Sequence, residues 1–218
     1  MKIATWNVNS IKVRLEHLIK WMELSRIDAV VLQETKTVDE LFPLAELQAA
    51  GFDAVFLGQK TYNGVALVTR KSSVISVSNV IYNIPGYPDD QKRMIAADIE
   101  HVSGTRLRFA GVYVPNGTEL GSNRYLYKLD WMSALTTWVR EQLESKPGKE
   151  ICWCHPPSAK PLSDSSRLVW SIPGRWVCTL LKPTVGGIIA RQALKRIMAF
   201  ASTMFLPPPT LPNASGKS

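Results

Sequence analysis

The chain contains few cysteines, no long apolar run and almost no acidic residues after position 150. All three cysteines, Cys152, Cys154 and Cys178, follow that position, so residues 1–150 have no disulfide framework. No apolar stretch approaches the roughly 20 residues that span a membrane, and strand-like sequence starts directly after Met1 without a signal-peptide pattern. We therefore expect a cytoplasmic protein with no membrane partner, and we take a monomer as the default oligomeric state.

Charge is distributed unevenly along the chain. Residues 1–150 carry 18 Lys and Arg against 17 Asp and Glu, a net charge of +1, whereas residues 151–218 carry 8 against the single acid Asp164, a net charge of +7. Nine of the 14 prolines also fall in this second part. These changes predict a domain over residues 1–152, followed by a basic, proline-rich and partly disordered tail over residues 153–218.

Hydrophobic periodicity predicts an α/β domain. A strand is expected over residues 3–6, an amphipathic helix over 11–22, a buried strand over 29–32 and a second helix over about 38–49. Further strands are expected over 52–57, 65–69, 74–80, 94–99 and 107–114, a helix over about 124–143, a strand from residue 150 and a basic helix over 185–200. This alternation of strands and helices, followed by many strands, fits a layered α/β architecture.

Three polar residues lie at the predicted strand ends: Asn7, Glu34 and Tyr113. A carboxylate directly after a buried strand is costly unless it is paired or binds a cation, and Mg²⁺ takes such oxygen ligands. An amide could orient the cation or a phosphate, and a phenol could donate a hydrogen bond to a phosphate as charge develops on it. Each residue also has a structural interpretation: Asn7 as a turn residue, Glu34 as the partner of Lys36, and Tyr113 as a core residue.

Several segments in register resemble one enzyme family. They read Thr-Trp-Asn-Val-Asn-Ser at 5–10, Val-Leu-Gln-Glu-Thr-Lys at 31–36, Gly-Val-Tyr-Val-Pro-Asn-Gly at 111–117 and Tyr-Leu-Tyr-Lys-Leu-Asp-Trp-Met at 125–132. Their order and separations are similar to those of exonuclease III-type abasic-site endonucleases of the endonuclease/exonuclease/phosphatase superfamily. Asn-Gly-Val-Ala at 63–66 and Gln-Lys-Arg at 91–93 also match. Because several motifs agree, the resemblance is specific; it covers residues 1 to about 152.

The resemblance implies a four-layer α/β sandwich, in which two facing mixed sheets are flanked by helices. It implies an enzyme that uses Mg²⁺, with Mn²⁺ as an alternative, to cleave duplex DNA on the 5′ side of abasic sites and to trim 3′ ends. On matching positions, Asn7 and Glu34 would bind the metal. Tyr113 and Asn116 would be catalytic at the phosphate, and Arg93 would bind substrate.

The sequence departs from the family after residue 152. Where the family has Gly-Asp-x-Asn, this chain reads Trp153-Cys154-His155, and no closing Ser-Asp-His follows. The resemblance therefore implies an incomplete sandwich and an impaired or inactive enzyme. Two other functions stay open: a non-catalytic DNA-binding remnant held by the basic tail, and a phosphodiesterase with another substrate. We hypothesise that the departure results from a shifted reading frame. The alternative is that the tail has diverged. The hypothesis fails if no other frame of the coding DNA encodes Gly-Asp-x-Asn soon after codon 152.

Overall fold

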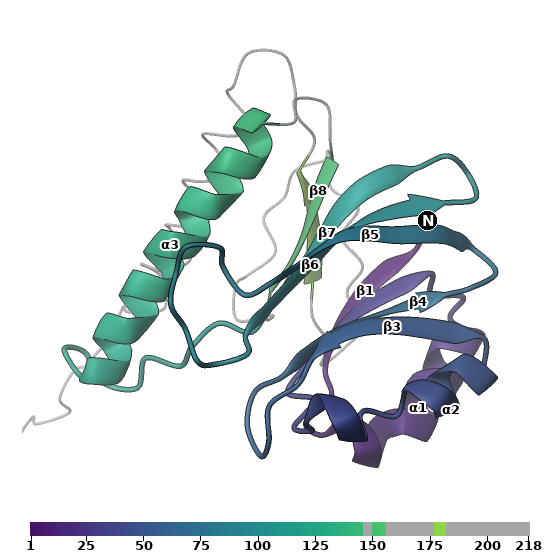
Figure 1. Cartoon of the computed structure of the whole chain (residues 1–218), viewed down its shortest axis with the longest axis horizontal. Coiled ribbons are helices and arrows are strands. Elements are labelled where there is room, and N and C mark those ends of the chain that lie inside the picture. The colour runs from purple at the N-terminus through teal and green to yellow at the C-terminus, as the bar shows by residue number, and fades with distance from the viewer. Residues whose placement is uncertain (146–149, 156–176, 182–218) are drawn as a thin grey trace, which may run out of the picture.

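Two mixed β-sheets face each other in the computed structural model, which describes residues 1–145, 150–155 and 177–181 (Figure 1). The first sheet has the order β1-β2-β4-β3 and the second β5-β6-β7-β8-β9. The β1/β2 and β7/β8 pairs are parallel and the other pairs are antiparallel. The strands are β1 (Ile3–Asn7), β2 (Ala29–Gln33), β3 (Phe52–Leu57), β4 (Val65–Arg70), β5 (Val74–Tyr82), β6 (Met94–His101), β7 (Arg106–Val112), β8 (Glu150–His155) and β9 (Val177–Leu181).

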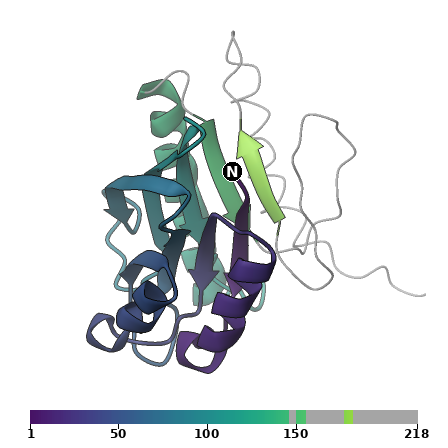
Figure 2. The ribbon, with the colours of Figure 1, turned by 90° about the vertical axis from the view of Figure 1, so that its right-hand side faces the viewer.

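Helices cover the outer faces of both sheets. Helices α1 (Ile11–Leu24) and α2 (Leu44–Ala49) pack on the first sheet, and α3 (Asn123–Ser145) packs on the second, at the opposite side of the molecule (Figures 1 and 2). Three apolar layers separate these four layers, and the middle one joins Val31 of β2 to Phe109 of β7. The predicted four-layer α/β sandwich is confirmed. That it is incomplete stays a prediction.

The predicted elements follow from the pattern of apolar residues. Every residue of β2 is buried, because this strand is covered by α1 on one face and by the second sheet on the other. Helix α1 buries Ile11, Leu18 and Met22 on one face, which is the stripe that the helical spacing predicted. None of the described helices is long and apolar enough to cross a membrane.

The helix predicted over 38–49 is wrong in its first half. The chain forms a short 3-10 helix, η1 (Asp39–Leu41), and α2 begins only at Leu44. Pro43 lies between them and has no N–H to donate to a preceding carbonyl, and it forces Phe42 into an extended conformation, with φ −70° and ψ 133°. Sequence periodicity had suggested one helix, but the proline divides it.

Part of the predicted tail lies in the second sheet. Residues 153–155 continue β8, and β9 pairs with β8 in antiparallel orientation. The basic helix expected over 185–200, and the disorder expected elsewhere in the tail, fall outside the described residues.

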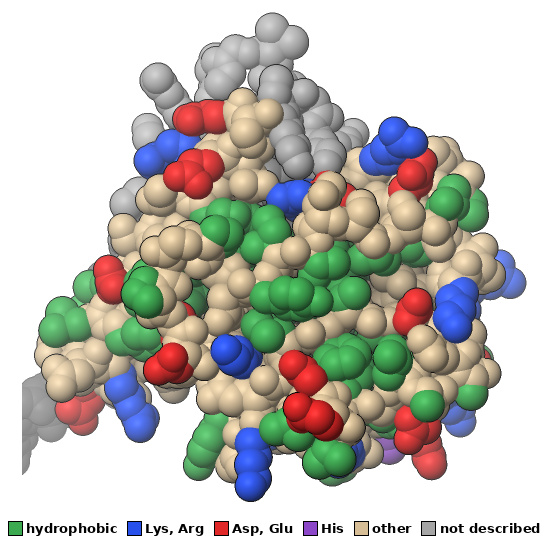
Figure 3. All heavy atoms as spheres, viewed as in Figure 1, with side chains coloured by type: hydrophobic (Ala, Val, Ile, Leu, Met, Phe, Trp, Pro, Cys, Tyr) green, Lys and Arg blue, Asp and Glu red, His purple; other side chains and the backbone are tan. Residues whose placement is uncertain are grey.

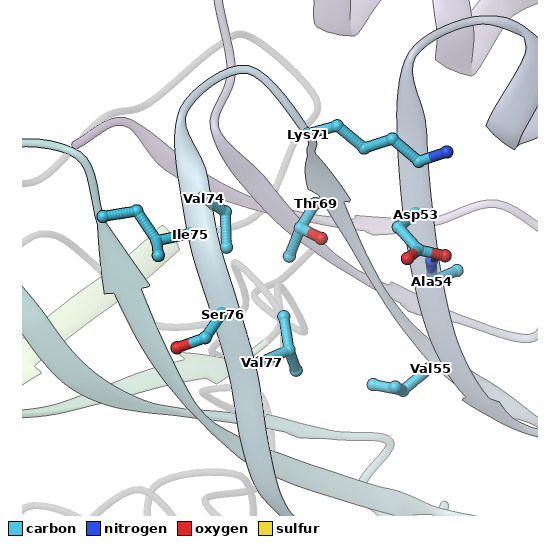
Figure 4. Close-up of a pocket in the computed structure, with 9 residues that line it drawn as sticks. All are labelled: Asp53, Ala54, Val55, Thr69, Lys71, Val74, Ile75, Ser76 and Val77. Carbon is cyan, nitrogen blue, oxygen red and sulfur yellow. Dashed lines mark hydrogen bonds between the residues drawn. The ribbon is translucent and has the colours of Figure 1, made fainter.

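A shallow cavity of about 390 Å³ lies between the edge strands of the two sheets. Asp53 and Val55 of β3 line it from one side, Val74 and Val77 of β5 line it from the other, and Lys71 lies at one end (Figure 4). Hydrophobic side chains gather on the same face of the molecule (Figure 3). The cavity is formed by the start of β3 and β5, and is therefore remote from the opposite ends of these strands, where the loops with the polar strand-end residues lie.

Gly111 fixes how closely the two sheets approach each other. A Cβ atom at this position of β7 would lie 1.9 Å from Cγ1 of Val31, which is fully buried in β2. No side chain larger than hydrogen fits there, so the glycine is required by packing between the sheets.

We expect Gly111→Ala to lower the free energy of unfolding by about 1–3 kcal/mol, because the added methyl group overpacks the core. Urea unfolding followed by tryptophan fluorescence measures the loss. The matched control is Val31→Ala, alone and combined with Gly111→Ala. Since the second alanine removes the clashing methyl groups, the double variant should lose less than the two single losses added together. Simple addition of the losses would contradict the proposed clash.

Candidate functional site

Loops from both sheets meet at one edge of the sandwich, where β1, β2 and β7 end. The Ser10 N–H donates to the Glu34 carbonyl at 2.8 Å, which joins the loops after β1 and β2. The Thr35 N–H donates to the Gly64 carbonyl at 3.2 Å, and the Gly64 N–H donates to the Lys92 carbonyl at 3.0 Å. This series of backbone hydrogen bonds runs from the first sheet to the loop before β6, and thus fixes the loops relative to one another.

Glu34 is the centre of this edge. Its Oε1 accepts a hydrogen bond from Asn7 Nδ2 at 2.6 Å and a second from the Tyr113 hydroxyl at 2.9 Å. Its Oε2 lies 3.0 Å from Nζ of Lys36. The three polar strand-end residues singled out in the sequence are therefore in direct contact. Glu34 pairs with Lys36, as its structural interpretation expected, and its carboxylate also joins Asn7 to Tyr113. Metal binding by Glu34 stays a prediction.

The backbone around the carboxylate adopts conformations that are rare for residues with side chains. Glu34 has φ 54°, Lys36 has φ 53°, and Asn9 has φ 44°. Left-handed conformations of this kind cost free energy and are found where the surrounding structure holds them in place. Here they turn the chain sharply after β1 and β2, so that the side chains that follow each strand face the same point.

Hydrogen bonding keeps the Glu34 carboxylate ionised. Burial opposes ionisation, but hydrogen bonds from Asn7, Lys36 and Tyr113 and the positive charge of Lys36 outweigh it and lower the pKa of Glu34. Burial, followed by the hydrogen bond to Glu34, raises the pKa of the Tyr113 phenol to about 12. Near neutral pH the site therefore presents a charged carboxylate beside a neutral hydroxyl donor.

Arg93 lies behind Tyr113 and not on the open surface. Its side chain is only 9% exposed. The guanidinium carbon lies 5.0 Å from the centre of the Tyr113 ring, Nη1 donates to the Tyr113 carbonyl at 3.2 Å, and Nε donates to Gln91 Oε1 at 2.9 Å. The expected role in substrate binding stays a prediction.

Asn116 lies three residues beyond Tyr113 in the loop after β7. It is exposed, and its Oδ1 accepts a hydrogen bond from the Thr118 N–H at 3.1 Å. It does not belong to the hydrogen-bonded group around Glu34. Its predicted catalytic role is not tested by this arrangement.

The donor set fits a hard divalent cation. The Glu34 carboxylate and the Asn7 amide lie side by side, with Asn7 Nδ2 donating to Glu34 Oε1 at 2.6 Å and Asn7 Oδ1 accepting from the Asn9 N–H at 3.1 Å. Carboxylate and amide oxygens are ligands that Mg²⁺ takes, and it binds through one or two carboxylates while it retains its waters. In the described part of the chain, no three His, Cys, Asp or Glu side chains gather in a metal-binding group. A metal site built from three or more such side chains is therefore not formed by these residues.

Sequence reasoning did not anticipate the polar residues behind the site. Asn63 Nδ2 donates to Gln91 Oε1 at 3.2 Å and to Gln59 Oε1 at 3.0 Å, so that two loops are joined by side chains. Asn63 and Gln91 belonged to matching segments, but nothing in their spacing indicated that they would touch. Asn63 has φ 53° and is 7% exposed.

Comparisons with known proteins identify the family of the chain. A model of the Endonuclease/Exonuclease/phosphatase family matches residues 4–148. The chain is 35% identical over 121 residues to exodeoxyribonuclease III of Haemophilus influenzae, across 54% of this chain and 42% of that protein. It thus spans less than half the length of this relative.

Solved structures give the same result. A 3′ phosphatase from Neisseria, bound to a product DNA hairpin, is 40% identical, with a TM-score of 0.61, over 70% of this chain and 56% of that one. An AP endonuclease from Archaeoglobus fulgidus is 30% identical, with a TM-score of 0.65, over 92% of this chain and 70% of that one. The chain therefore belongs to the endonuclease/exonuclease/phosphatase family, and within it to the exonuclease III and AP endonuclease group.

Proposed function

We propose that this chain carries the metal-binding and phosphate-binding part of a Mg²⁺-dependent DNA-repair nuclease. The observation that supports this proposal is the contact of Asn7 and Tyr113, from opposite sheets, with one oxygen of Glu34. A carboxylate, an amide and a neutral phenol at one point are the groups that a cation and a phosphate require together. The named relatives, which process DNA, support this substrate class.

Phosphodiester hydrolysis passes through a transition state in which negative charge builds on the phosphate oxygens. Glu34 and Asn7 would hold the cation, which when bound supplies positive charge to those oxygens. The Tyr113 hydroxyl would donate a hydrogen bond to the scissile phosphate. Mn²⁺ takes the same oxygen ligands and would substitute for Mg²⁺.

The substrate that we propose is duplex DNA with an abasic site or a 3′ end. The family relationship implies cleavage on the 5′ side of the abasic site and trimming of 3′ ends. In this chain we expect the chemical step to be impaired or absent, because Gly-Asp-x-Asn does not follow β8 and no Ser-Asp-His follows it. The resemblance implies that the aspartate of Gly-Asp-x-Asn activates or orients the attacking water, and this chain lacks that aspartate after β8.

A second function, non-catalytic binding to DNA, is favoured by the net charge of +7 over residues 151–218. Binding of this kind is independent of sequence and weakens steeply as salt rises. A phosphodiesterase with another substrate is the third possibility. Equal binding of abasic and intact duplexes, without Mg²⁺-dependent cleavage, would favour the DNA-binding remnant.

Cation binding is tested without relying on catalysis. We expect one Mn²⁺ ion to bind to the protein, measured by the loss of the free-ion signal in electron paramagnetic resonance, and Mg²⁺ to compete with it. Glu34→Gln should weaken this binding at least about tenfold, since second-shell changes alone cost that much at metal sites. Glu46→Gln is the matched control, because Glu46 is exposed on α2. Equal Mn²⁺ affinity in Glu34→Gln and wild type would contradict the proposal that Glu34 binds the cation.

Cleavage is tested on a labelled duplex with one abasic site, in Mg²⁺ and in chelator. Without the water-activating aspartate, we expect cleavage about 10²–10⁴-fold slower than by Haemophilus influenzae exodeoxyribonuclease III at equal concentration. Any residual cleavage should require Mg²⁺ and Glu34. Cleavage at the rate of that relative would contradict the proposed impairment while supporting the nuclease assignment.

The role of Tyr113 as a donor requires its hydroxyl to stay protonated. With the pKa raised to about 12, Tyr113 should contribute to the tyrosinate absorbance near that pH in an alkaline titration. Because the pKa of Tyr87 is also raised to about 12, the Tyr113 component is the part of this signal that Tyr113→Phe removes. In Glu34→Gln this component should move towards the ordinary value of 10.0, because the accepting carboxylate and its charge are gone. Tyr82→Phe, at an exposed residue of β5, serves as the control, and circular dichroism checks folding at each pH. A Tyr113 component near 10.0 in the folded wild type would show that the contact with Glu34 is not formed.

A further inference from the structure

Arg93 is held by more contacts than a surface arginine that binds DNA would be. Two guanidinium nitrogens, Nε at 2.9 Å and Nη2 at 2.5 Å, donate to Oε1 of Gln91, and Nη1 donates to the Tyr113 carbonyl at 3.2 Å. The guanidinium also faces the rings of Tyr113 at 5.0 Å and Tyr127 at 6.0 Å. With 9% of its surface exposed, little of this side chain is left to meet a phosphate.

The backbone of the same residue also holds Tyr113. The Tyr113 N–H donates to the Arg93 carbonyl at 2.7 Å, so the two residues exchange hydrogen bonds between the end of the loop before β6 and the loop after β7. The Arg93 guanidinium contacts one face of the Tyr113 ring, and Arg93 also forms hydrogen bonds with the backbone of Tyr113. Together these contacts fix the position and the orientation of the phenol. These constraints leave its hydroxyl 2.9 Å from Glu34 Oε1.

The contacts form a closed circuit through both sheets. The Lys36 N–H donates to the Asn63 carbonyl at 3.1 Å, and Asn63 Nδ2 donates to Gln91 Oε1 at 3.2 Å. Gln91 accepts from Arg93, Arg93 holds Tyr113, and the Tyr113 hydroxyl returns to Glu34, two residues before Lys36. Because the loops are joined in this way, a shift of the Arg93 side chain would also move the Tyr113 phenol.

We propose that Arg93 is a positioning residue, which acts through Tyr113 and does not contact the DNA. The guanidinium lies over the phenol ring, with its carbon 5.0 Å from the ring centre, and reaches Gln91 and the Tyr113 carbonyl at the same time. The proposal rests on the proposed function for its consequence in catalysis, but the positioning itself is a property of the protein without substrate. It replaces the expectation that Arg93 binds substrate, which would need an exposed guanidinium.

The test is fluorine NMR of the whole chain labelled with 3-fluorotyrosine. The Tyr113 resonance is assigned by its loss in Tyr113→Phe. We expect this resonance to move and broaden in Arg93→Met, because the ring loses the guanidinium on its face and the hydrogen bond to its peptide. Arg93→Lys keeps the charge and is the milder change. It should also displace the resonance, because one ammonium cannot reproduce the forked contact of the guanidinium with Gln91 and the Tyr113 carbonyl.

Arg70→Met is the matched control. Arg70 also faces an aromatic ring, with its guanidinium carbon 5.0 Å from the centre of the Phe52 ring, and its Nε donates to the Ile27 carbonyl at 3.1 Å. It lies at the far end of β4 from Gly64. The same chemical change should therefore lower stability there and leave the Tyr113 resonance in place. A wild-type Tyr113 resonance in whichever Arg93 variant folds would overturn the proposal.

Cleavage provides a second readout wherever the wild type cleaves measurably. Arg93→Met should slow cleavage about tenfold or more, with an unchanged dissociation constant for an uncleavable abasic duplex. In the Tyr113→Phe background it should add less than about a twofold further loss, because residues that act through one another are not additive. A weaker dissociation constant with full additivity would instead identify Arg93 as a DNA contact. If Mn²⁺ does not bind, the proposed function fails but the positioning role of Arg93 does not, because the NMR experiment needs no metal.

Discussion

The site depends on one oxygen atom. Oε1 of Glu34 accepts from Asn7, which ends β1 in the first sheet, and from Tyr113, which follows β7 in the second. Both donors can reach it only while the two sheets keep their separation and register. Gly111 and Val31 set that separation a few residues before Tyr113 and Glu34, because no side chain fits between them. The separation of the sheets that core packing sets at Gly111 and Val31 therefore also sets the distance between Glu34 and Tyr113.

The sequence predicted the strands up to β8, most of the described helices and the three residues that meet, because each depends on local pattern. It missed β9, which lies in the part of the chain that was predicted to be a tail. Apolar periodicity located β2 and α1, and a carboxylate directly after a buried strand indicated Glu34. It failed at Pro43, where periodicity suggested a helix and proline chemistry prevented one. It could not find the contact of Asn63 with Gln91, because these residues are 28 positions apart and touch only after both sheets have formed.

Arg93 illustrates a different limit. Its position in a matching segment suggested that it serves the site, but sequence does not reveal on which side of the phenol an arginine lies. The structure places it beneath the ring, in contact with Gln91 and 9% exposed. A buried arginine needs partners for its charge, and here its partners are an amide oxygen, a carbonyl and aromatic faces. On the positioning role that we propose, this burial lets Arg93 order its neighbour Tyr113 and leaves little of it to contact substrate.

The group around Glu34 is balanced in charge and hydrogen bonding by residues 7–113 alone. Lys36 offsets the carboxylate at 3.0 Å, and Asn7 and Tyr113 donate to its other oxygen. A bound cation would enter beside Lys36, so its binding free energy includes the cost of weakening that ion pair. On the proposed function, this makes metal binding and bond cleavage separable properties. The first depends on residues that lie before the departure from the family pattern, and the second on an aspartate expected after it. A chain that departs from its family at residue 152 would therefore lose catalysis before it loses the architecture that holds metal and phosphate.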